Sequence, residues 1–184
     1  MIKKLILATA AVLSIVTLSG CQSAPQPVAL NPQLSTSPTG DQISLRVRDQ
    51  RAQNHIMRLE QNDNTAEFAT ADPSLASLIS ERIGERWQVV DEANAHLEVT
   101  IIDALFVVKQ GSLRHDTAHN LRLHAQLTTS DAEFEKTFRG TRESNGPLRA
   151  DIRRIEREFA GLLADVLTDI AEDEQLTTRI QAAQ

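Results

Sequence analysis

The chain has 184 residues, a formal net charge of −6, 3% aromatic residues, one cysteine and no tyrosine. This acidic composition argues against nonspecific nucleic-acid binding, which needs basic stripes, and the few aromatic residues argue against stacking platforms for bases or sugars. The length suits a single domain that can bury a proper core.

The first twenty residues have the pattern of a secretory signal peptide. Lys3 and Lys4 give a positively charged start, residues 5–18 are mostly apolar and carry no charge, and small residues follow. The apolar run is shorter than the roughly 20 residues that a transmembrane helix needs. We therefore predict that residues 1–20 are a lipoprotein signal peptide that is removed on export.

Cys21 is the predicted lipid-attachment site. The run Leu18-Ser19-Gly20-Cys21 resembles the lipobox of bacterial lipoproteins. This resemblance implies that the sulfur receives a diacylglyceryl group and that the amine freed by cleavage receives an acyl chain such as palmitate. Gln22 is not the aspartate that favours inner-membrane retention, which implies the outer membrane and a domain on its periplasmic side. The alternative is an uncleaved apolar segment with an incidental cysteine.

Residues 21–40 are predicted to form the lipid-anchored tether of one domain, residues 41–184. Serine, threonine and glutamine separate four prolines: Pro25, Pro27, Pro32 and Pro38. Such a composition favours an extended, poorly ordered segment that lifts the domain off the lipid surface.

The domain is predicted to begin with two strands and a helix. Apolar and polar residues alternate over 43–48, which is the period of a half-buried strand, and residues 55–59 form a weaker second strand. Asp72 and Pro73 suit the N-cap and the first position of a helix. The apolar residues of this helix recur at three- and four-residue spacing: Leu75, Leu78, Ile79, Ile83 and Trp87.

Three further strands and a long helix follow. Residues 95–108 form the strongest strand. Because apolar residues occupy both the odd and the even positions, we expect its later half to be covered on both faces. Alternation over 121–127 and the apolar residues of 134–138 predict the next two strands. An apolar stripe from Leu148 to Ala171 predicts a helix of about six turns, after which the polar end either continues as a short helix or frays.

This order of elements predicts an α+β fold, with a mainly antiparallel sheet of four to five strands and two helices packed on one face. The order, the lipobox, the turn Lys109-Gln110-Gly111 and the stretch Val166–Ala171 together resemble the YajG family of uncharacterised bacterial lipoproteins. The resemblance covers nearly the whole chain and implies a lipid-anchored protein of unassigned activity. The layout is also similar to small lipoprotein subunits that accompany envelope lipid-transport machines, which is a likeness of fold alone.

The histidines do not predict a metal site. His115, His119 and His124 lie close in the sequence, but His119 and His124 have opposite parity on their strand and therefore face opposite sides. Zinc needs three or four ligands within tetrahedral reach, so structural or surface roles are expected for these histidines.

Catalysis is not expected either. Asp103, on an apolar strand face, is a candidate perturbed carboxylate, or marks a bulge or an exposed edge. We favour a structural ion pair with Arg122 or Lys136, or an edge position, over catalysis. The chain has no Gly-rich phosphate loop and no Gly-x-Ser-x-Gly elbow. We predict no enzyme activity, no catalytic residue, no metal and no cofactor beyond the acyl chains on Cys21.

An arginine-rich stretch begins the last long helix: Arg149, Arg153, Arg154 and Arg157. It suits a phospholipid or another anionic partner, or else a solvated face on which Arg154 pairs with Glu158 and Asp151. Acidic neighbours dilute the positive charge, and we favour the solvated face.

Two functions remain. The first is a non-catalytic accessory module that binds an envelope protein through an open sheet edge or face. The alternative is a carrier or sensor of a small lipid or cell-wall ligand, which would need an apolar cleft between helices and sheet. In both cases the membrane is reached through the lipid anchor, and no nucleic-acid partner is expected.

Overall fold

Three long antiparallel strands form the centre of the fold. They are β5 (His96–Gln110), β6 (Arg114–Thr128) and β7 (Glu133–Pro147), each of fifteen residues and paired along its length. The computed structural model describes residues 26–62 and 65–184. Buried residues recur at every second position of β6, and over 121–127 they are all apolar, so this part of the meander presents an apolar face.

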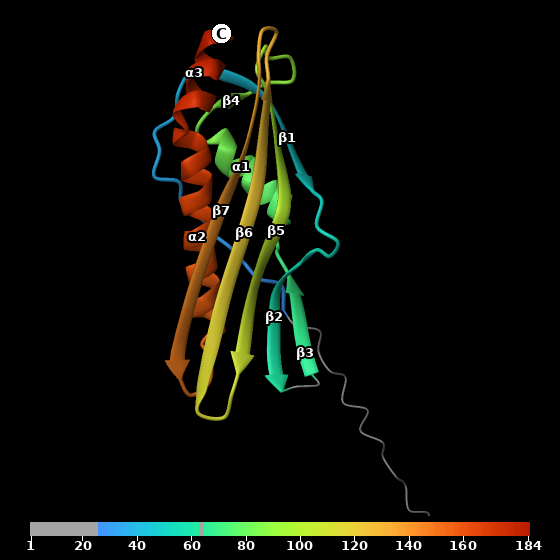
Figure 1. The fold of residues 1–184 in the computed structure, drawn as a ribbon, viewed down its shortest axis with the longest axis vertical. Coiled ribbons are helices and arrows are strands. Elements are labelled where there is room, and N and C mark those ends of the chain that lie inside the picture. The colour runs from blue at the N-terminus through green and yellow to red at the C-terminus, as the bar shows by residue number, and fades with distance from the viewer. Residues whose placement is uncertain (1–25, 63–64) are drawn as a thin grey trace, which may run out of the picture.

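Four shorter strands complete the sheet on the free edge of β5 (Figure 1). β1 (Gln42–Asp49) pairs in parallel with the first part of β5, and β2 (His55–Asn62) pairs in parallel with its last part. β3 (Thr65–Thr70) extends the sheet beyond β2, and β4 (Gln88–Val89) extends it beyond β1. The α+β class is therefore correct, but the sheet has seven strands, not four or five, and β5 has parallel partners.

Three helices cover one face of the sheet. α2 (Ile152–Glu172) packs along β6 and β7, whereas α1 (Leu75–Gly84) packs on β1 (Figure 1). α3 (Glu174–Ala182) follows α2 after a cap at Asp173, and its two buried residues hold it against the core, so the polar end is a helix of its own. Within the described residues, none of the helices combines the length and the apolar character needed to cross a membrane.

α1 begins two residues later than the sequence pattern predicts. Ser74, not Asp72, is the N-cap, and its hydroxyl accepts a hydrogen bond from the Ser77 amide at 3.2 Å. The Asp72 amide donates instead to the carbonyl of Val28 at 3.0 Å. The helix ends at Gly84, so Trp87 contributes to the core from beyond the helix, where it is 1% exposed.

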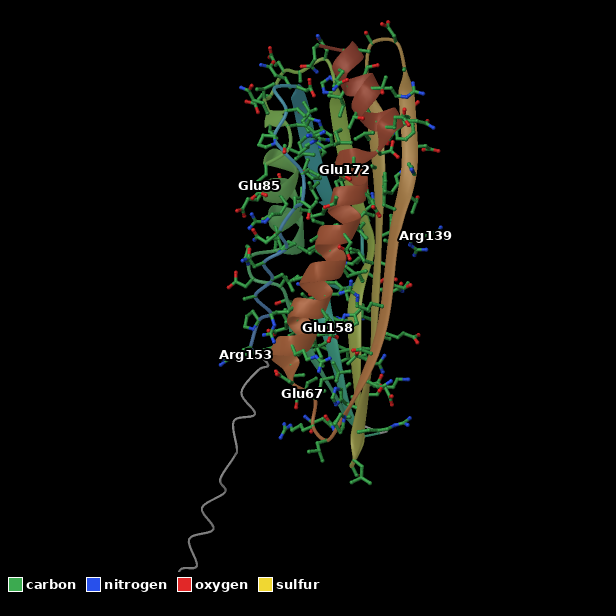
Figure 2. All side chains as sticks on the ribbon, turned by 90° about the vertical axis from the view of Figure 1, so that its left-hand side faces the viewer. Glu67, Glu85, Arg139, Arg153, Glu158 and Glu172 are labelled. Atoms are coloured by element: carbon green, nitrogen blue, oxygen red, sulfur yellow. The ribbon has the colours of Figure 1, made fainter. Side chains whose placement is uncertain are left out.

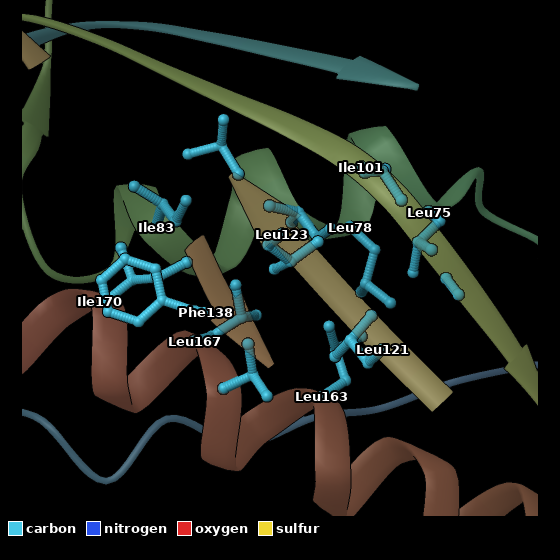
Figure 3. Close-up of a cluster of buried hydrophobic side chains, with 14 of the residues drawn as sticks. Leu75, Leu78, Ile83, Ile101, Leu121, Leu123, Phe138, Leu163, Leu167 and Ile170 are labelled. Atoms are coloured by element: carbon cyan, nitrogen blue, oxygen red, sulfur yellow. The ribbon is translucent and has the colours of Figure 1, made fainter. Parts of the chain in front are cut away.

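The apolar faces of α1, α2 and the sheet form one core (Figure 3). Each buried leucine, isoleucine or phenylalanine contributes roughly 1.5–3 kcal/mol through removal of apolar surface from water. Gly140 in β7 lets α2 lie close to the sheet, because a Cβ there would be 2.7 Å from Leu162 Cδ1 and 2.8 Å from Val166 Cγ2. The interior between α2 and the sheet is therefore filled by side chains.

A bulge in β5 decides which of its residues face the helices. The register with β6 shifts between Ile101 and Asp103. Before the bulge, Leu97, Val99 and Ile101 are buried; after it, the buried parity is that of Ala104, Phe106 and Val108. The expectation that both faces of the later half are covered is therefore wrong, because the extra residue moves the apolar set back to the same face.

Residues 28–40 belong to the domain, which corrects the prediction that the tether extends to residue 40. Val28 and Leu30 are buried, and Leu34 is partly buried against the core. The Val28 amide donates to the Thr70 carbonyl at 2.8 Å, and the Thr39 amide donates to the Arg86 carbonyl at 2.7 Å. Figure 2 shows this segment in blue between α1 and α2. We call residues 28–40 the strap.

Candidate functional site

The junction between β1 and β2 is the main irregularity of the sheet. Both strands lie along the same edge of β5, and the chain leaves that edge between them. Arg51 fills the gap: its Nη1 donates to the carbonyls of Ala104 at 2.9 Å and His55 at 3.0 Å. Its Nε and Nη2 donate to the Asp49 carboxylate at 2.9 and 2.6 Å. The side chain is only 7% exposed, so it replaces the strand partner that β5 lacks here.

This ion pair shifts the titration of Asp49. The side-chain hydrogen bonds from Arg51 lower the pKa of the Asp49 carboxyl below its usual value, although partial burial acts in the opposite direction. Asp49 therefore remains ionised at neutral pH and holds the guanidinium in place.

The junction opens a hollow of about 510 Å³ on the sheet face that carries no helix. The polar wall includes Arg51, Arg58 and Asp103, whereas Phe68 and Ile102 provide apolar surface. Phe68 is 46% exposed and Ile102 is 37% exposed, although both are large apolar side chains. We call this surface the open-face site.

Two aromatic rings meet at the rim of the open-face site. The imidazole of His55 lies 4.7 Å from the ring of Phe68, centroid to centroid. Burial lowers the pKa of His55, and the neighbouring cations Arg51 and Arg58 lower it further. His55 is thus predominantly neutral at neutral pH, which suits an apolar partner more than an anionic one.

Asp103 lies beside the hollow, at the β5 bulge that was one of its predicted positions. Its carboxylate accepts a hydrogen bond from Asn120 Nδ2 at 2.9 Å, and no ion pair with Arg122 or Lys136 is formed. Arg122 is opposite Asp103 in the register, but Lys136 pairs with Asp173 at 2.5 Å on the helix face. The predicted partners are therefore wrong, and Asp103 is a hydrogen-bonded surface carboxylate.

Two arginines face each other next to the open-face site. Arg122 on β6 is directly opposite Arg139 on β7, and within residues 26–62 and 65–184 neither forms an ion pair. Figure 2 shows Arg139 projecting from the sheet on the side away from the helices. Like charges at directly opposite positions are unfavourable, so a carboxylate supplied from outside would stabilise this pair.

His119 lies on the other face of β6, beneath α2. Its ring stacks on Phe106 at 5.8 Å and on Phe159 at 6.1 Å. Neither ring nitrogen has a hydrogen-bond partner among the described residues, and Nε2 is 3.7 Å from the Glu158 carboxylate. Burial lowers the pKa of His119, which the Glu158 charge offsets in part and the Arg142 charge reinforces.

Glu158 is fixed by hydrogen bonds, one of which engages the hydroxyl of Ser144. Its carboxylate accepts hydrogen bonds from Ser144 Oγ at 2.8 Å and from Arg154 Nε at 3.0 Å. Burial raises the pKa of Glu158, but these hydrogen bonds outweigh it and the net shift is downward. Ser144 Oγ also lies 2.6 Å from Thr117 Oγ1. The group joins α2 to β6 and β7 and has the geometry of a structural network.

The predicted pairing of Arg154 is half right. The ion pair with Glu158 forms, whereas Asp151 uses its side chain to accept from the Arg154 backbone amide at 3.3 Å, as the N-cap of α2. The guanidinium of Arg154 therefore has one carboxylate partner, not two.

The remaining histidines are dispersed. His124 lies on the open face, with Nδ1 3.2 Å from Thr137 Oγ1, and His115 Nδ1 is 3.3 Å from the Leu148 carbonyl. Among the residues that the structure describes, no three His, Cys, Asp or Glu side chains are placed to hold a metal ion. Cys21 and the signal peptide lie outside the described residues.

The fold is similar to that of a solved structure. The crystal structure of protein XCC0632 from Xanthomonas campestris, of family DUF330, matches 87% of this chain and 100% of its own with a TM-score of 0.60 and 13% identity. A crystal structure titled as an uncharacterised protein covers 80% of this chain and 99% of its own, with a TM-score of 0.45 and 13% identity. At this identity the first likeness shows the fold alone. No curated protein matches the chain.

The sequence family gives the more specific assignment. A family model described as "Uncharacterized lipoprotein" matches residues 29–181, a range that includes most of the strap and all the helices and strands described above. The chain therefore belongs to this family of uncharacterised lipoproteins, the YajG family.

Proposed function

We propose that this protein is a non-catalytic accessory lipoprotein, anchored through Cys21 to the outer membrane, which binds an envelope protein partner through the open-face site. The observation that carries this proposal is the contrast between the two sheet faces. The helix face is filled by core side chains, whereas the opposite face leaves Phe68 and Ile102 exposed beside a 510 Å³ hollow. Exposed apolar side chains grouped in a concave site are typical of an interaction surface.

The charges around the site favour a partner that contributes carboxylates. Arg122 and Arg139 lie opposite each other without an ion pair among the described residues. Arg58 forms one ion pair in the same part of the chain, with Glu60 at 3.0 Å. A partner that places an acidic group near Arg122 and an apolar side chain in the hollow would satisfy both features.

A photo-activatable cross-linking residue at position 68 tests the site in cells. We expect one dominant envelope protein to be captured from this position. Glu172, which is exposed on α2 at the other face (Figure 2), is the control position and should not capture it. Capture of the same proteins from both positions would contradict the open-face site.

Absence of any cross-linked partner would favour the alternative function, a carrier or sensor of a small lipid or cell-wall ligand. The observation that supports this alternative is a second hollow of about 380 Å³ at the beginning of α2, whose apolar lining includes Leu59, Leu148 and Ile152. Extraction of the purified protein, followed by mass spectrometry for lipids and muropeptides, would then identify the ligand.

Two substitutions test the anchor separately from the site. Cys21→Ala removes the only thiol, so we expect a protein without acyl chains that no longer fractionates with the outer membrane. Gln22→Asp keeps the acylated cysteine and should move the protein to the inner membrane. Wild-type protein recovered without acyl chains in the soluble fraction would contradict the anchor.

A further inference from the structure

Two leucines are exposed side by side at one end of the molecule. Leu113, in the β5–β6 turn, is 80% exposed, and Leu148, between β7 and α2, is 66% exposed. The Leu148 amide donates to the Leu113 carbonyl at 2.8 Å. This end, at the bottom of Figure 1, is opposite to the C-terminus. We call it the leucine tip.

The leucine tip is held in shape by polar contacts. Leu148 has a φ of 61°, a left-handed conformation that is unfavourable for a residue with a Cβ. Gln110 stabilises this conformation: its Nε2 donates to the Leu148 carbonyl at 3.2 Å, and its Oε1 accepts from the Ala150 amide at 2.8 Å. The leucines are therefore presented to solvent by a defined structure.

Two exposed arginines lie next to the leucine tip, together with the carboxylates of Asp151 and Glu156, the second of which is within electrostatic reach of Arg153. Arg149 lines the adjoining hollow with Leu148, and Arg153 lies in the first turn of α2, at the lower end of the helix in Figure 2. Both are exposed, and within the described residues neither forms an ion pair. The neighbouring Asp151 is already engaged as the N-cap of α2.

The chain before the domain, if fully extended, is about long enough to bring the lipid anchor level with this end. Cys21 and Val28 are seven residues apart, and seven extended residues span at most about 25 Å. Val28 lies beside Thr70, which is opposite His55 at the start of β2. From there, β2 and the β5–β6 turn extend to Leu113 over roughly 25 to 30 Å, at about 3.3 Å per residue.

We propose that the leucine tip inserts into the surface of the bilayer that carries the anchor. Leu113 and Leu148 enter the boundary between headgroups and acyl chains, while Arg149 and Arg153 face lipid phosphates. Apolar side chains combined with cations are the pattern by which proteins contact an anionic lipid surface. This inference rests on the lipid anchor of the proposed function. With the strands upright on the bilayer, the open-face site lies on the side of the molecule and stays clear of the lipid (Figure 1).

Fluorescence of the acylated protein in vesicles tests this orientation. Leu113→Trp would be incorporated into phosphatidylethanolamine–phosphatidylglycerol vesicles whose acyl chains are brominated. Bromine should quench the new tryptophan and shift its emission to shorter wavelength. Trp87 is 1% exposed and stays unquenched as an internal background. Val89→Trp is the control, because Val89 is exposed on β4 at the opposite end of the molecule.

The outcomes separate the tip from the anchor. Loss of the protein from the vesicles in high salt would contradict the anchor itself. A protein that stays bound while Leu113→Trp is quenched no more than Val89→Trp would overturn insertion of the tip. A blue shift without quenching would overturn it too, because it would place the tip against a second copy of this chain. Arg149→Glu together with Arg153→Glu should lower the quenching of Leu113→Trp, and unchanged quenching would overturn the role of these arginines.

Discussion

The side chain that most directly holds the sheet together is Arg51, which occupies the gap between β1 and β2. Arg51→Ala leaves the Ala104 carbonyl without its side-chain donor and leaves the Asp49 carboxylate with only the backbone amide of residue 51. We therefore expect it to lower the free energy of unfolding by about 2–3 kcal/mol. Arg51→Lys should recover only part of this, because an ammonium group cannot donate to β5 and Asp49 in the same fork geometry. Urea denaturation measures both.

Arg58→Ala is the matched control for this prediction. Arg58 is on the same rim but is 46% exposed and pairs only with Glu60, so its loss should change stability by less than about 1 kcal/mol. Equal effects of the two substitutions would show that Arg51 is an ordinary surface arginine.

His119 should make the protein less stable in mild acid. Burial lowers its pKa in the folded state, so the unfolded chain binds the proton more tightly. The stabilisation from the neutral ring is then complete above about pH 6.5, the ordinary pKa of histidine, and is lost as the pH falls toward the lower folded value. His119→Leu should remove this contribution and flatten the dependence of stability on pH below 6.5.

Denaturation at a series of pH values measures that slope, and His124→Leu serves as the control. His124 is on the open face and contacts Thr137 and Glu135, so its replacement should leave the acid-dependent loss in place. If His119→Leu keeps the wild-type slope, the buried histidine is not its source.

At the level of elements, periodicity predicts those that bury a continuous apolar stripe. The strands β5 and β6 and the helices α1 and α2 have such stripes and are present near their predicted positions. β7 is also present, although Phe138 is its single buried side chain. Asp103 among apolar neighbours predicts either a bulge or an exposed edge, and the structure has the bulge. The sequence pattern does not show which side of the sheet the strand faces after the bulge.

The elements that the sequence did not predict bury little apolar surface of their own. β3 contains a single large apolar residue, Phe68, which is exposed, and β4 has two residues. β4 pairs with β1, which is far away in the sequence. β3 pairs with the preceding strand β2, but the register of this pair shifts twice. The open-face site could not be predicted either. It forms where β1 and β2 meet along β5, and no local sequence pattern indicates that junction.

The contact between α2 and β7 depends on the absence of a side chain at Gly140. A Cβ at this position would lie 2.7 and 2.8 Å from α2 side chains, so Gly140→Ala should displace the helix and cost about 1–3 kcal/mol. Gly40→Ala is the control, because a Cβ there has no atom within 4 Å. A thermal melt compares the two, and equal melting temperatures would mean that α2 adjusts without cost.

For the molecule as a whole, the strap decides where the domain begins. Composition predicted a tether to residue 40 because proline, serine and threonine usually mark disorder. The same segment nevertheless places an apolar residue at alternate positions, Val28 and Leu30, and these are buried with the core. The family match also begins at residue 29. The segment between Cys21 and the domain is therefore shorter in sequence than predicted, which limits how far the domain can lie from the lipid anchor.

Truncation tests the strap directly. Removal of residues 26–40 exposes core surface that Val28 and Leu30 cover, and each such side chain contributes roughly 1.5–3 kcal/mol. A chain of residues 41–184 should therefore unfold at a lower temperature than one of residues 26–184. The unfolding temperature of Leu30→Ala in the longer chain should lie between those two values. A chain of residues 28–184 is the control, because Gln26 and Pro27 are exposed. Equal melting temperatures for 41–184 and 26–184 would show that the strap follows the fold without stabilising it.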